Sequence, residues 1–578
     1  MTRRRFLAFL DPDRDRRRAL AARATSAGLT TRRDDAAMTV MTEHEAPVLD
    51  LGDAGLILGE LRAPGLAGPV HALTADDIDA IRRSGGAALI EGYWGDYLAF
   101  PADEAPAGVS IVRAPFGGPP CLHVTVGTMT VVGSDVALIA EAARWTPRPD
   151  WDGVARHLAA SELRRRDTCL SGLGEVRGGD RLRVGAGRTR AETLWSPWRF
   201  TALDQRIGDP DEAAVRVRDA ARACVAARVP PDRSALLLLS GGLDSSIVAA
   251  CLAHAGRTFE CLTVTTDDPT GDERAHARLV AERLGAPLLE AGRRLEHVDL
   301  ERSSAAGAPR PTARSFEQDS DMLVAAAARA SGALVVSGGG GDNVFSSLQS
   351  AAPAADCLLA RDGTAAFWRT AREVSAMTGA SFLTVARRAW ARARRPDRGY
   401  RWPADRRFLT PAAAERAHGF DDHPWIRAPA DTLPGRAAHA ALLAPAQSLA
   451  EDAPSGASSA MPVLLSQPLV ETCLRVPSRL WVERGCNRAA ARRAFAPDLP
   501  PVIAWRRDKG TPDSFLVQLL ERNRPTVRRL LLDGLLAERG IVDRGALART
   551  LDDPRPTVGH DYVRVMQLVD VEVWARGW

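Results

Sequence analysis

Lysine is almost absent from this chain: Lys509 is the only one among 578 residues, and every other basic side chain is an arginine. Aromatic residues are also scarce, at 5% of the sequence, whereas alanine and arginine are abundant. This bias is typical of GC-rich coding, which replaces lysine by arginine without a structural demand. The 76 basic residues nearly balance the 72 acidic ones, for a net charge of +4. The composition therefore excludes a polybasic protein that binds nucleic acid through its overall charge.

Cysteine and long apolar segments are scarce too. The eight cysteines are irregularly spaced and form no CxxC pair, which argues against a disulfide framework or a zinc site and favours a reducing compartment. The apolar run Phe6–Leu10 is too short for a signal peptide. No segment approaches the roughly 20 apolar residues that cross a bilayer. We therefore expect a soluble, cytoplasmic protein without a membrane span.

The length predicts more than one domain, and the hydrophobic pattern changes near residue 200. Up to that point, short apolar runs alternate with turns, as in residues 55–61, 87–100 and 121–133, which is typical of a sheet-rich domain. Residues 196–212 have the pattern of a linker that leads into a helix. We expect a first domain over residues 1–200 and a second over residues 210–578.

The second domain has the pattern of an α/β fold. Continuous apolar runs at 234–242, 259–268 and 333–342 predict strands buried on both faces, and the segments 243–256 and 272–285 between them have helical periodicity. This alternation predicts a doubly wound parallel sheet. From about residue 345 onward the pattern is mainly helical.

The strongest motif is LLLLSGGLDSS at residues 236–246, where a buried strand breaks into a turn and a helix. Free backbone N–H groups, serine hydroxyls and a helix N-terminus make such a junction an anion site suited to phosphate, and its glycines allow a close approach of backbone to ligand. The residues are Ser240, Gly241, Gly242, Ser245 and Ser246. Asp244 fits a phosphate cradle if it holds Mg²⁺. The alternative is a simple turn with an N-capping aspartate.

A second strand ends in SGGGGD at residues 337–342. At the end of a neighbouring parallel strand this loop faces the first across the carboxyl edge of the sheet, where Asp244 and Asp342 can share a magnesium ion. The alternative is a flexible glycine turn.

Lys509 is the third feature. A compact ammonium stabilises negative charge on transition-state oxygens as a point charge, whereas the arginine head is wider and planar. The alternative is a chance lysine on an exposed turn.

Together these motifs resemble the asparagine synthetase B-like branch of the ATP-pyrophosphatase superfamily. SGGLDSS is similar to its pyrophosphate loop, and Ser337, Gly338, Gly340 and Asp342 fit its SGxGxD motif. Arg506 to Lys509 stands where the family has a late R-x-x-K motif with an essential lysine. Gly339 occupies a position that is glutamate in asparagine synthetase and tyrosine in β-lactam synthetases, which argues against both activities.

Residues 337–358 and 462–495 closely resemble the lasso peptide isopeptide bond-forming cyclases. These enzymes adenylate an Asp or Glu side chain of a precursor peptide, and the peptide N-terminal amine then closes a macrolactam. The resemblance implies a degenerate Ntn glutamine amidotransferase-like N-terminal domain. We do not expect glutamine hydrolysis, because the chain begins MTRRRF and its first cysteine is Cys121.

The resemblance implies a set of site residues and partners. ATP phosphates would lie on the two loops, with Asp244 and Asp342 binding Mg²⁺ and Lys509 acting in catalysis. The backbone of Leu238 and Val264 would hold adenine, an expectation from strand position. The expected partners are a precursor peptide, a leader protease and a leader-binding protein.

Four points stay open on the sequence alone. Glu373 and Glu451 are acidic candidates for the base, with solvated surface residues as the alternative. The arginine-rich section 391–408 is either a peptide contact or a solvated face. The rival functions are an amide synthetase acting on a small molecule and an inactive ATP-binding scaffold of a maturation complex. Ring size and the choice of Asp or Glu are not encoded in any motif.

Overall fold

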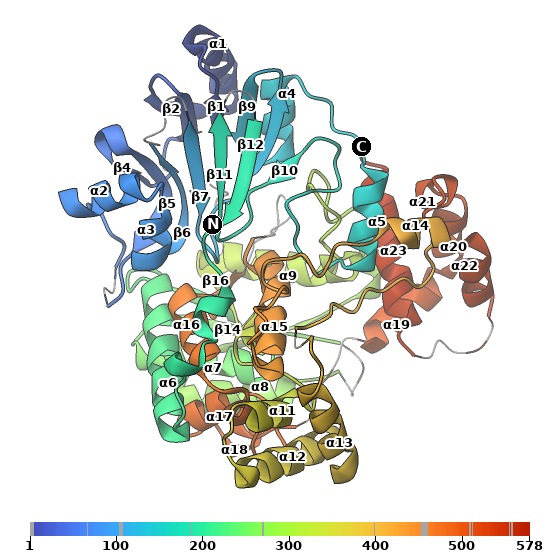
Figure 1. Ribbon diagram of the computed structural model, residues 1–578. Coiled ribbons are helices and arrows are strands. Elements are labelled where there is room, and N and C mark those ends of the chain that lie inside the picture. Colours follow the sequence, from blue (N-terminus) through green and yellow to red (C-terminus); the bar gives the residue numbers. More distant parts are fainter. Residues whose placement is uncertain are drawn as a thin grey trace.

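The computed structural model describes residues 5–65, 68–102, 108–185, 188–266, 268, 271–397, 399–451, 460–507, 510, 513–553, 555 and 559–578. The antiparallel strands of the N-terminal part form the upper half of Figure 1, and the parallel sheet and most later helices lie below them.

The N-terminal part contains two six-stranded antiparallel sheets, in the orders β10-β8-β9-β1-β3-β2 and β12-β11-β7-β6-β5-β4. The strands of the first are β1 (Phe6–Leu10), β2 (Leu29–Asp34), β3 (Met38–Glu43), β8 (Leu122–Val126), β9 (Met129–Gly133) and β10 (Gly174–Glu175). Those of the second are β4 (Val48–Asp50), β5 (Gly55–Arg62), β6 (Trp94–Pro101), β7 (Val109–Arg113), β11 (Asp180–Gly185) and β12 (Arg188–Thr193). The sheet-rich prediction is therefore confirmed.

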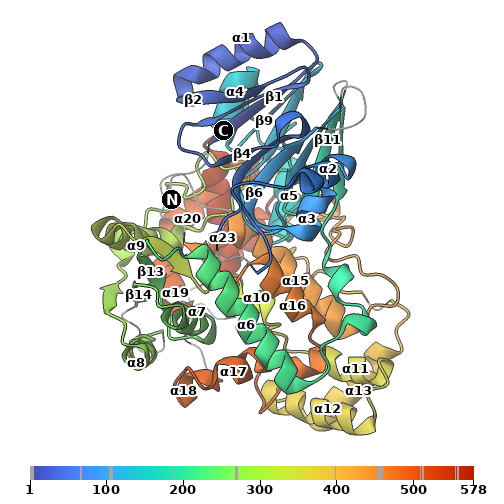
Figure 2. The same cartoon turned by 90° about the vertical axis from the view of Figure 1, so that its left-hand side faces the viewer.

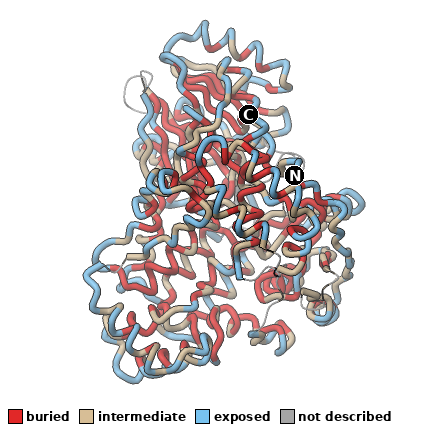
Figure 3. Tube along the Cα trace, turned by 90° about the vertical axis from the view of Figure 1, so that its right-hand side faces the viewer, coloured by how far each residue is buried: buried red, intermediate tan, exposed pale blue. Residues whose placement is uncertain are grey.

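The two sheets pack face to face. Alternate side chains of β1 and β6 meet between them, where the rings of Phe6 and Phe100 lie 6.2 Å apart and edge to face. Helices cover the outer faces, α1 (Arg14–Ala24) and α4 (Val136–Ala143) on one side and α2 (Ala75–Arg83) and α3 (Ala87–Gly92) on the other (Figure 2). The buried strands run through the middle of this part in Figure 3.

One expected strand run is partly helical. Residues 87–100 divide into α3 and β6, because Gly85 and Gly86 both take positive φ and turn the chain into a short helix first. A Cβ at Gly86 would lie 2.6 Å from the Val112 side chain, so this turn needs glycine.

The second sheet system is entirely parallel, in the order β15-β14-β13-β16-β17, which confirms the predicted doubly wound sheet. Its strands are β13 (Ala235–Leu238), β14 (Phe259–Thr265), β15 (Leu288–Gly292), β16 (Leu334–Ser337) and β17 (Met461–Pro462). The chain runs outward from β13 through β14 to β15, and then returns to pair β16 with the other side of β13. The topological switch point, where ligands of such sheets bind, therefore lies between β13 and β16.

Helices cover both faces of the parallel sheet. Leu237 of β13 faces α7 (Leu243–His254) and α8 (Arg274–Leu284), whereas Leu236 faces Val324 of α9 (Gln318–Ser331). Two-sided burial explains the uninterrupted apolar run of this strand. α6 (Pro210–Arg228) leads into the sheet from the N-terminal part.

The rest of the chain is mainly helical, as expected. Its helices are α5 (Trp151–Ala159) from the N-terminal part, and then α10 (Gly341–Val344), α11 (Ala352–Leu359), α12 (Thr364–Thr378), α13 (Phe382–Ala393), α14 (Pro411–Arg416), α15 (Pro434–Glu451), α16 (Gln467–Arg475), α17 (Ala489–Phe495), α18 (Pro501–Ala504), α19 (Asp513–Arg522), α20 (Arg524–Leu532), α21 (Leu535–Glu538), α22 (Arg544–Leu551) and α23 (Asp561–Ala575). α23 returns to the N-terminal part, where Arg564 donates to the carbonyl of Leu158. In the described part of the chain, no helix has the length and apolar character needed to cross a membrane.

A buried carboxylate joins the two halves. Glu175 on β10 is 1% exposed and forms ion pairs with Arg113, Arg164 and Arg310, of which Arg310 belongs to the C-terminal half. Burial disfavours the charge of Glu175, but the three guanidinium groups outweigh it and hold the pKa of this carboxyl well below its usual value. One hydrophobic cluster also runs from β1 to α23, so the division near residue 200 stays a prediction.

We expect Glu175→Gln to lower the free energy of unfolding by about 3–5 kcal/mol, because it leaves three buried arginines without their carboxylate. The pKa of Glu175 is lowered in the fold, so its contribution is present above the unfolded pKa and is lost as the pH falls toward the folded value. Denaturant unfolding at neutral pH measures the change. Glu91→Gln, at the exposed Glu91–Arg199 pair, is the matched control and should change stability by less than about 1 kcal/mol.

Candidate active site

The first loop has the geometry that its sequence predicts. β13 ends at Leu238, the turn passes through Ser240–Gly242, and α7 begins at Leu243. Gly241 has φ +68°, and a Cβ there would lie 2.6 Å from the Cβ of His276, so only glycine fits. The Oγ of Ser245 accepts a hydrogen bond from the N–H of Ser240 at 3.3 Å and holds the turn.

α7 begins without a side-chain cap. Gly242 is its N-cap residue, and Asp244 lies inside the first turn. The alternative of an N-capping aspartate is therefore wrong for Asp244. Because no side chain caps the helix, its first N–H groups are directed toward the carboxyl edge of the sheet, where an anion can accept from them.

The second loop packs directly on the first. β16 pairs with β13 so that Ser337 lies opposite Leu238. A Cβ at Gly338 would lie 2.5 Å from the N of Ser245, and one at Gly341 would lie 2.5 Å from the Cβ of Asp244. These glycines are what bring the two loops into contact.

Arg488 joins the two predicted magnesium ligands, and sequence reasoning missed it. Its Nη1 lies 2.8 Å from Oδ2 of Asp244 and 2.5 Å from Oδ1 of Asp342. Arg488 precedes α17 in the left-handed region, at φ +57° and ψ +26°. The side chains of Asp244 and Arg488 are each 12% exposed, whereas that of Asp342 is 51% exposed. The structure thus brings both carboxylates onto one cation.

This donor set fits Mg²⁺ only together with phosphate. Among the residues that the structure describes, no cluster of three or more His, Cys, Asp or Glu side chains has the arrangement of a metal site. Two carboxylates can bind Mg²⁺ when nucleotide phosphates and water supply the other oxygens, which is the usual mode for this ion. Asp244 and Asp342 would hold it, in the space that the guanidinium of Arg488 now bridges.

The two residues expected near adenine lie on one face of the sheet. Leu238 and Val264 belong to the same apolar cluster, on the side covered by α9. Leu238 also lines a large cavity, described below. The contact of their backbone with adenine stays a prediction.

Lys509 lies outside the described residues, but its surroundings along the chain are anchored. The carboxylate of Glu273, just before α8, accepts from Nη2 of Arg506 at 2.7 Å and from the N–H of Gly510 at 2.6 Å. Burial disfavours the charge of Glu273, but these two hydrogen bonds outweigh it and keep its pKa below the usual value. Arg492 of α17 links the carbonyls of Asn487 and Ala504, both at 2.8 Å.

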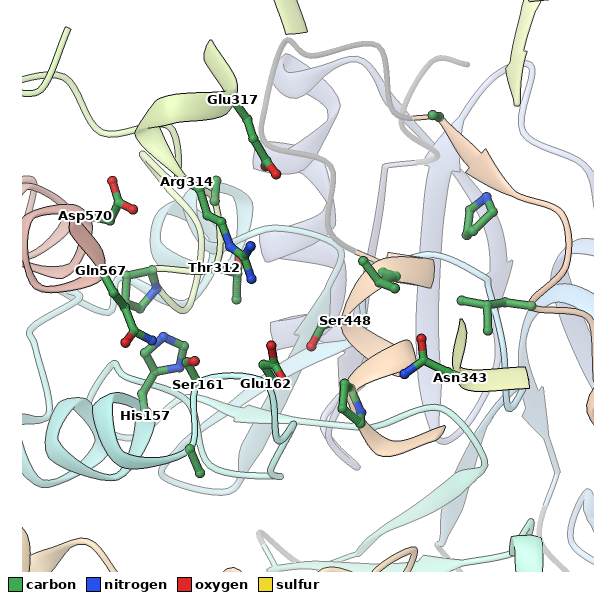
Figure 4. Close-up of a pocket in the computed structure, with 18 of the residues that line it drawn as sticks. His157, Ser161, Glu162, Thr312, Arg314, Glu317, Asn343, Ser448, Gln567 and Asp570 are labelled. Carbon is green, nitrogen blue, oxygen red and sulfur yellow. The ribbon is translucent and has the colours of Figure 1, made fainter. Parts of the chain in front are cut away.

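A cavity of about 970 Å³ adjoins the loops. The N-terminal part contributes residues such as Glu162, the parallel sheet contributes Leu238, and α23 contributes Asp570. Asn343 of the second loop also lines it. In Figure 4, Arg314 and Glu317 project into the cavity from one wall, with Ser161 and Glu162 on the wall below.

Glu373, one of the two acidic candidates for the base, does not line this cavity. It lies on α12 and accepts the N–H of Gly485 at 2.8 Å, a structural role. The side chain of Glu451 lies outside the described residues. Within the basic section 391–408, Tyr400 and Trp402 line the cavity, whereas Arg401 is paired with Asp397 at the surface.

The two segments that carry the cyclase resemblance meet in space. Asp356 of the first segment accepts from Oγ of Ser478 in the second at 2.6 Å and from the N–H of Gly435 at 2.7 Å. Burial raises the pKa of Asp356 to about 6. Asn487 also donates to Ser347 at 3.1 Å, one residue before Arg488.

The cysteines of the N-terminal part are structural. All eight cysteines are buried, and none forms a disulfide with another described residue. Burial raises the pKa of the Cys169 thiol to about 12, and Cys121 is fully buried between the sheets. Neither thiol has the exposure of a nucleophile.

Comparisons with known proteins give a family match for the C-terminal part of the chain. Residues 216–576 match the family model described as Asparagine synthase. A segment of 122 residues is 36% identical to the carboxyethyl-arginine beta-lactam-synthase of Streptomyces clavuligerus, covering 21% of this chain and 23% of that protein.

Two solved structures give only weak likenesses. The allosteric regulatory enzyme of purine biosynthesis is 9% identical, with 50% of this chain and 75% of that chain covered and a TM-score of 0.20. The glutamine phosphoribosylpyrophosphate amidotransferase from B. subtilis, complexed with ADP and GMP, is 8% identical, with 58% and 90% covered and a TM-score of 0.21. Scores this low support no statement about the fold.

Proposed function

Because the chain belongs to the asparagine synthase family, we propose that it is an ATP-dependent amide ligase that adenylates a carboxylate and releases AMP and pyrophosphate. The observation that carries this proposal is the meeting of two glycine loops at the switch point of the parallel sheet, where Asp244 and Asp342 converge on one cation. The proposal covers the whole protein, although the curated relative is matched over only 23% of its length.

In this mechanism the backbone of Ser240–Gly242, Ser245 and Ser246 receives the phosphates, together with Ser337, Gly338 and Gly340 of the second loop. Asp244 and Asp342 would hold Mg²⁺, which would supply positive charge to the phosphate oxygens. Arg488 releases these carboxylates and donates to phosphate instead, since its guanidinium suits that ligand. Lys509 stabilises charge as the carboxylate attacks the α-phosphorus and as the amine attacks the adenylate.

The finer proposal is that the substrate is a peptide and the product a macrolactam. The cavity of about 970 Å³ is at the upper end of the range for small-molecule pockets, and three separate parts of the chain line it. Gly339 carries no side chain, and a Cβ there would lie 3.2 Å from Oγ of Ser337 and 3.6 Å from Cβ of Pro462. The similarity of residues 337–358 and 462–495 to lasso peptide cyclases supports the same substrate class. A leader protease and a leader-binding protein would supply the freed peptide in the cytoplasm.

Linear peptides with a free N-terminal amine and a single Asp or Glu at successive positions test the proposal. With ATP and Mg²⁺ we expect one of them to lose one water by mass, with equal amounts of AMP and pyrophosphate. ADP formation, or no nucleotide cleavage with any substrate, would contradict the ligase.

The rival is an amide synthetase acting on a small molecule, which the 36% identity to a β-lactam synthase over 122 residues favours. AMP formed with a small carboxylic acid, and with none of the peptides, would support this rival. An inactive scaffold would form no AMP with either.

Arg488→Gln is expected to raise the KM for ATP by about 10- to 100-fold, the equivalent of one charge-assisted hydrogen bond of about 1.5–3 kcal/mol. It should also tighten the binding of Mn²⁺ in the absence of nucleotide, because Asp244 and Asp342 lose their internal cation. Initial rates and Mn²⁺ titration measure the two effects. Arg493→Gln, on the exposed side of α17, is the control. Unchanged KM and Mn²⁺ affinity for Arg488→Gln would remove Arg488 from the site.

A further inference from the structure

Two neighbouring carboxylates at the start of α9 line the cavity and have no hydrogen-bond or ion-pair partner among the described residues. Glu317 immediately precedes α9, and Asp321 lies in its first turn, four residues later and on the same face of the helix. Figure 4 shows Glu317 projecting into the cavity.

The position of α9 places both carboxylates at the edge of the sheet where the phosphate loops lie. α9 leads into β16 and packs antiparallel to it, so the N-terminus of the helix is at the carboxyl edge of the strands. Leu238 and Asp321 line the same cavity, and Val324, one turn further along α9, packs in the cluster that contains Leu238.

Glu317 and Asp321 are both exposed to solvent on the cavity side, and the protein packed around their carboxyl groups still disfavours negative charge. Burial raises the pKa of Glu317, and burial together with the charge of Glu317 raises the pKa of Asp321 to about 6. Across the cavity on α23, burial raises the pKa of Asp570 to about 7, although Ser315 donates to it at 3.0 Å.

The nearby cations do not neutralise the pair. Arg293 donates to the carbonyl of Phe316 and stacks 4.0 Å above the ring of Phe515. Arg314 favours the charged forms of Glu317 and Asp570. Burial nevertheless has the larger effect on the pKa of both carboxyl groups and keeps it raised. Asp319, in the same turn of α9, is paired with His297 at 2.6 Å. A cationic ligand would supply the missing charge.

We propose that Glu317 and Asp321 form the binding site for the protonated acceptor amine, hold its ammonium beside the adenylate, and take up the proton that it must lose. The inference rests on the proposed function and names the base that its mechanism requires. The carboxylate pair removes one proton from the ammonium, and the nitrogen lone pair forms the C–N bond to the acyl carbon. The C–O bond to AMP then breaks with its electron pair on the AMP oxygen, and the second proton passes from the nitrogen to the other carboxylate of the pair as the amide forms.

Separating the two half-reactions tests the inference. Glu317→Gln, Asp321→Asn and the double variant should retain ATP–pyrophosphate exchange within about threefold of wild type, because adenylation does not use these groups. Peptide amide formation should fall by at least about 100-fold, the usual contribution of a general base. In the wild type the rate of amide formation should rise as the pH increases through about 6, because the base loses its proton there. This rise should be absent from the pH profiles of the variants.

The matched control is Glu282→Gln, which removes an exposed carboxylate of α8 that does not line the cavity. It should leave amide formation near wild type. N-acetylation of the peptide should weaken its binding to the wild type by about tenfold but leave binding to the double variant unchanged.

The outcomes separate this inference from the proposed function. Amide formation retained in the double variant, or an equal loss in Glu282→Gln, would overturn the role of the pair while leaving the ligase intact. Absence of pyrophosphate exchange in the wild type would overturn the proposed function, and this inference with it.

Discussion

Asp244→Asn is expected to abolish ATP-dependent pyrophosphate exchange, with a loss of at least about 10³-fold. Asparagine keeps the shape of the side chain but removes the negative charge that binds Mg²⁺ beside the triphosphate. It also replaces the carboxylate that pairs with Arg488 by a neutral amide. Asp342→Asn should have the same effect, since Asp342 faces the same guanidinium. The exchange of labelled pyrophosphate into ATP measures it.

The fold should tolerate this change. Asp244 lies within the first turn of α7 and does not cap the helix. Asp211→Asn, on the exposed end of α6, is the matched control and should exchange pyrophosphate at the wild-type rate. Exchange at more than about a tenth of the wild-type rate in Asp244→Asn, over a range of Mg²⁺ concentrations, would contradict a metal role.

Lys509→Arg is expected to reduce amide formation by about 10²- to 10³-fold, the usual cost of losing one preorganised donor to a developing negative charge. Arginine keeps the charge, but its planar head spreads that charge and has a different reach. Single-turnover formation of AMP and peptide product, followed together, measures the loss. The melting temperature should stay within about 1–2 °C, because the substitution conserves the charge and a single such change usually has a small effect on stability.

Arg507→Lys is the control for Lys509→Arg. Arg507 donates to the carbonyl of Arg484 and is two residues away in the same segment. The control should retain amide formation at near the wild-type rate. A wild-type rate in Lys509→Arg would show that the single lysine of this chain is incidental.

The features that the sequence predicts best are those set by local chemistry. A continuous apolar run has few alternatives to a strand buried on both faces, so β13 and β16 were predictable. The loop beside Asp244 was predictable as one that approaches a ligand, but its contact with Gly338 and Gly341 of the second loop depends on the order of the strands. That order follows from the pairing of β16 with β13, which no local pattern encodes.

Arg488 could not be predicted for a related reason. It comes from a left-handed residue before α17, almost 250 residues after Asp244 along the chain, and it is one arginine among many. The partners of Glu175 pose the same problem, since Arg310 reaches it from the other half of the chain. The role of the Glu317 and Asp321 pair depends on a cavity between distant segments. Long-range packing, rather than local pattern, determines all three.

The central claim is that a carboxylate becomes an acyl-adenylate on the two loops before an amine displaces AMP. It is tested most directly with a peptide whose acceptor carboxylate carries ¹⁸O in both oxygens. Attack on the α-phosphorus leaves one carboxylate oxygen in the product nucleotide, so we predict that AMP carries one ¹⁸O for each amide formed. Label in inorganic phosphate with release of ADP, or AMP without label, would contradict the account.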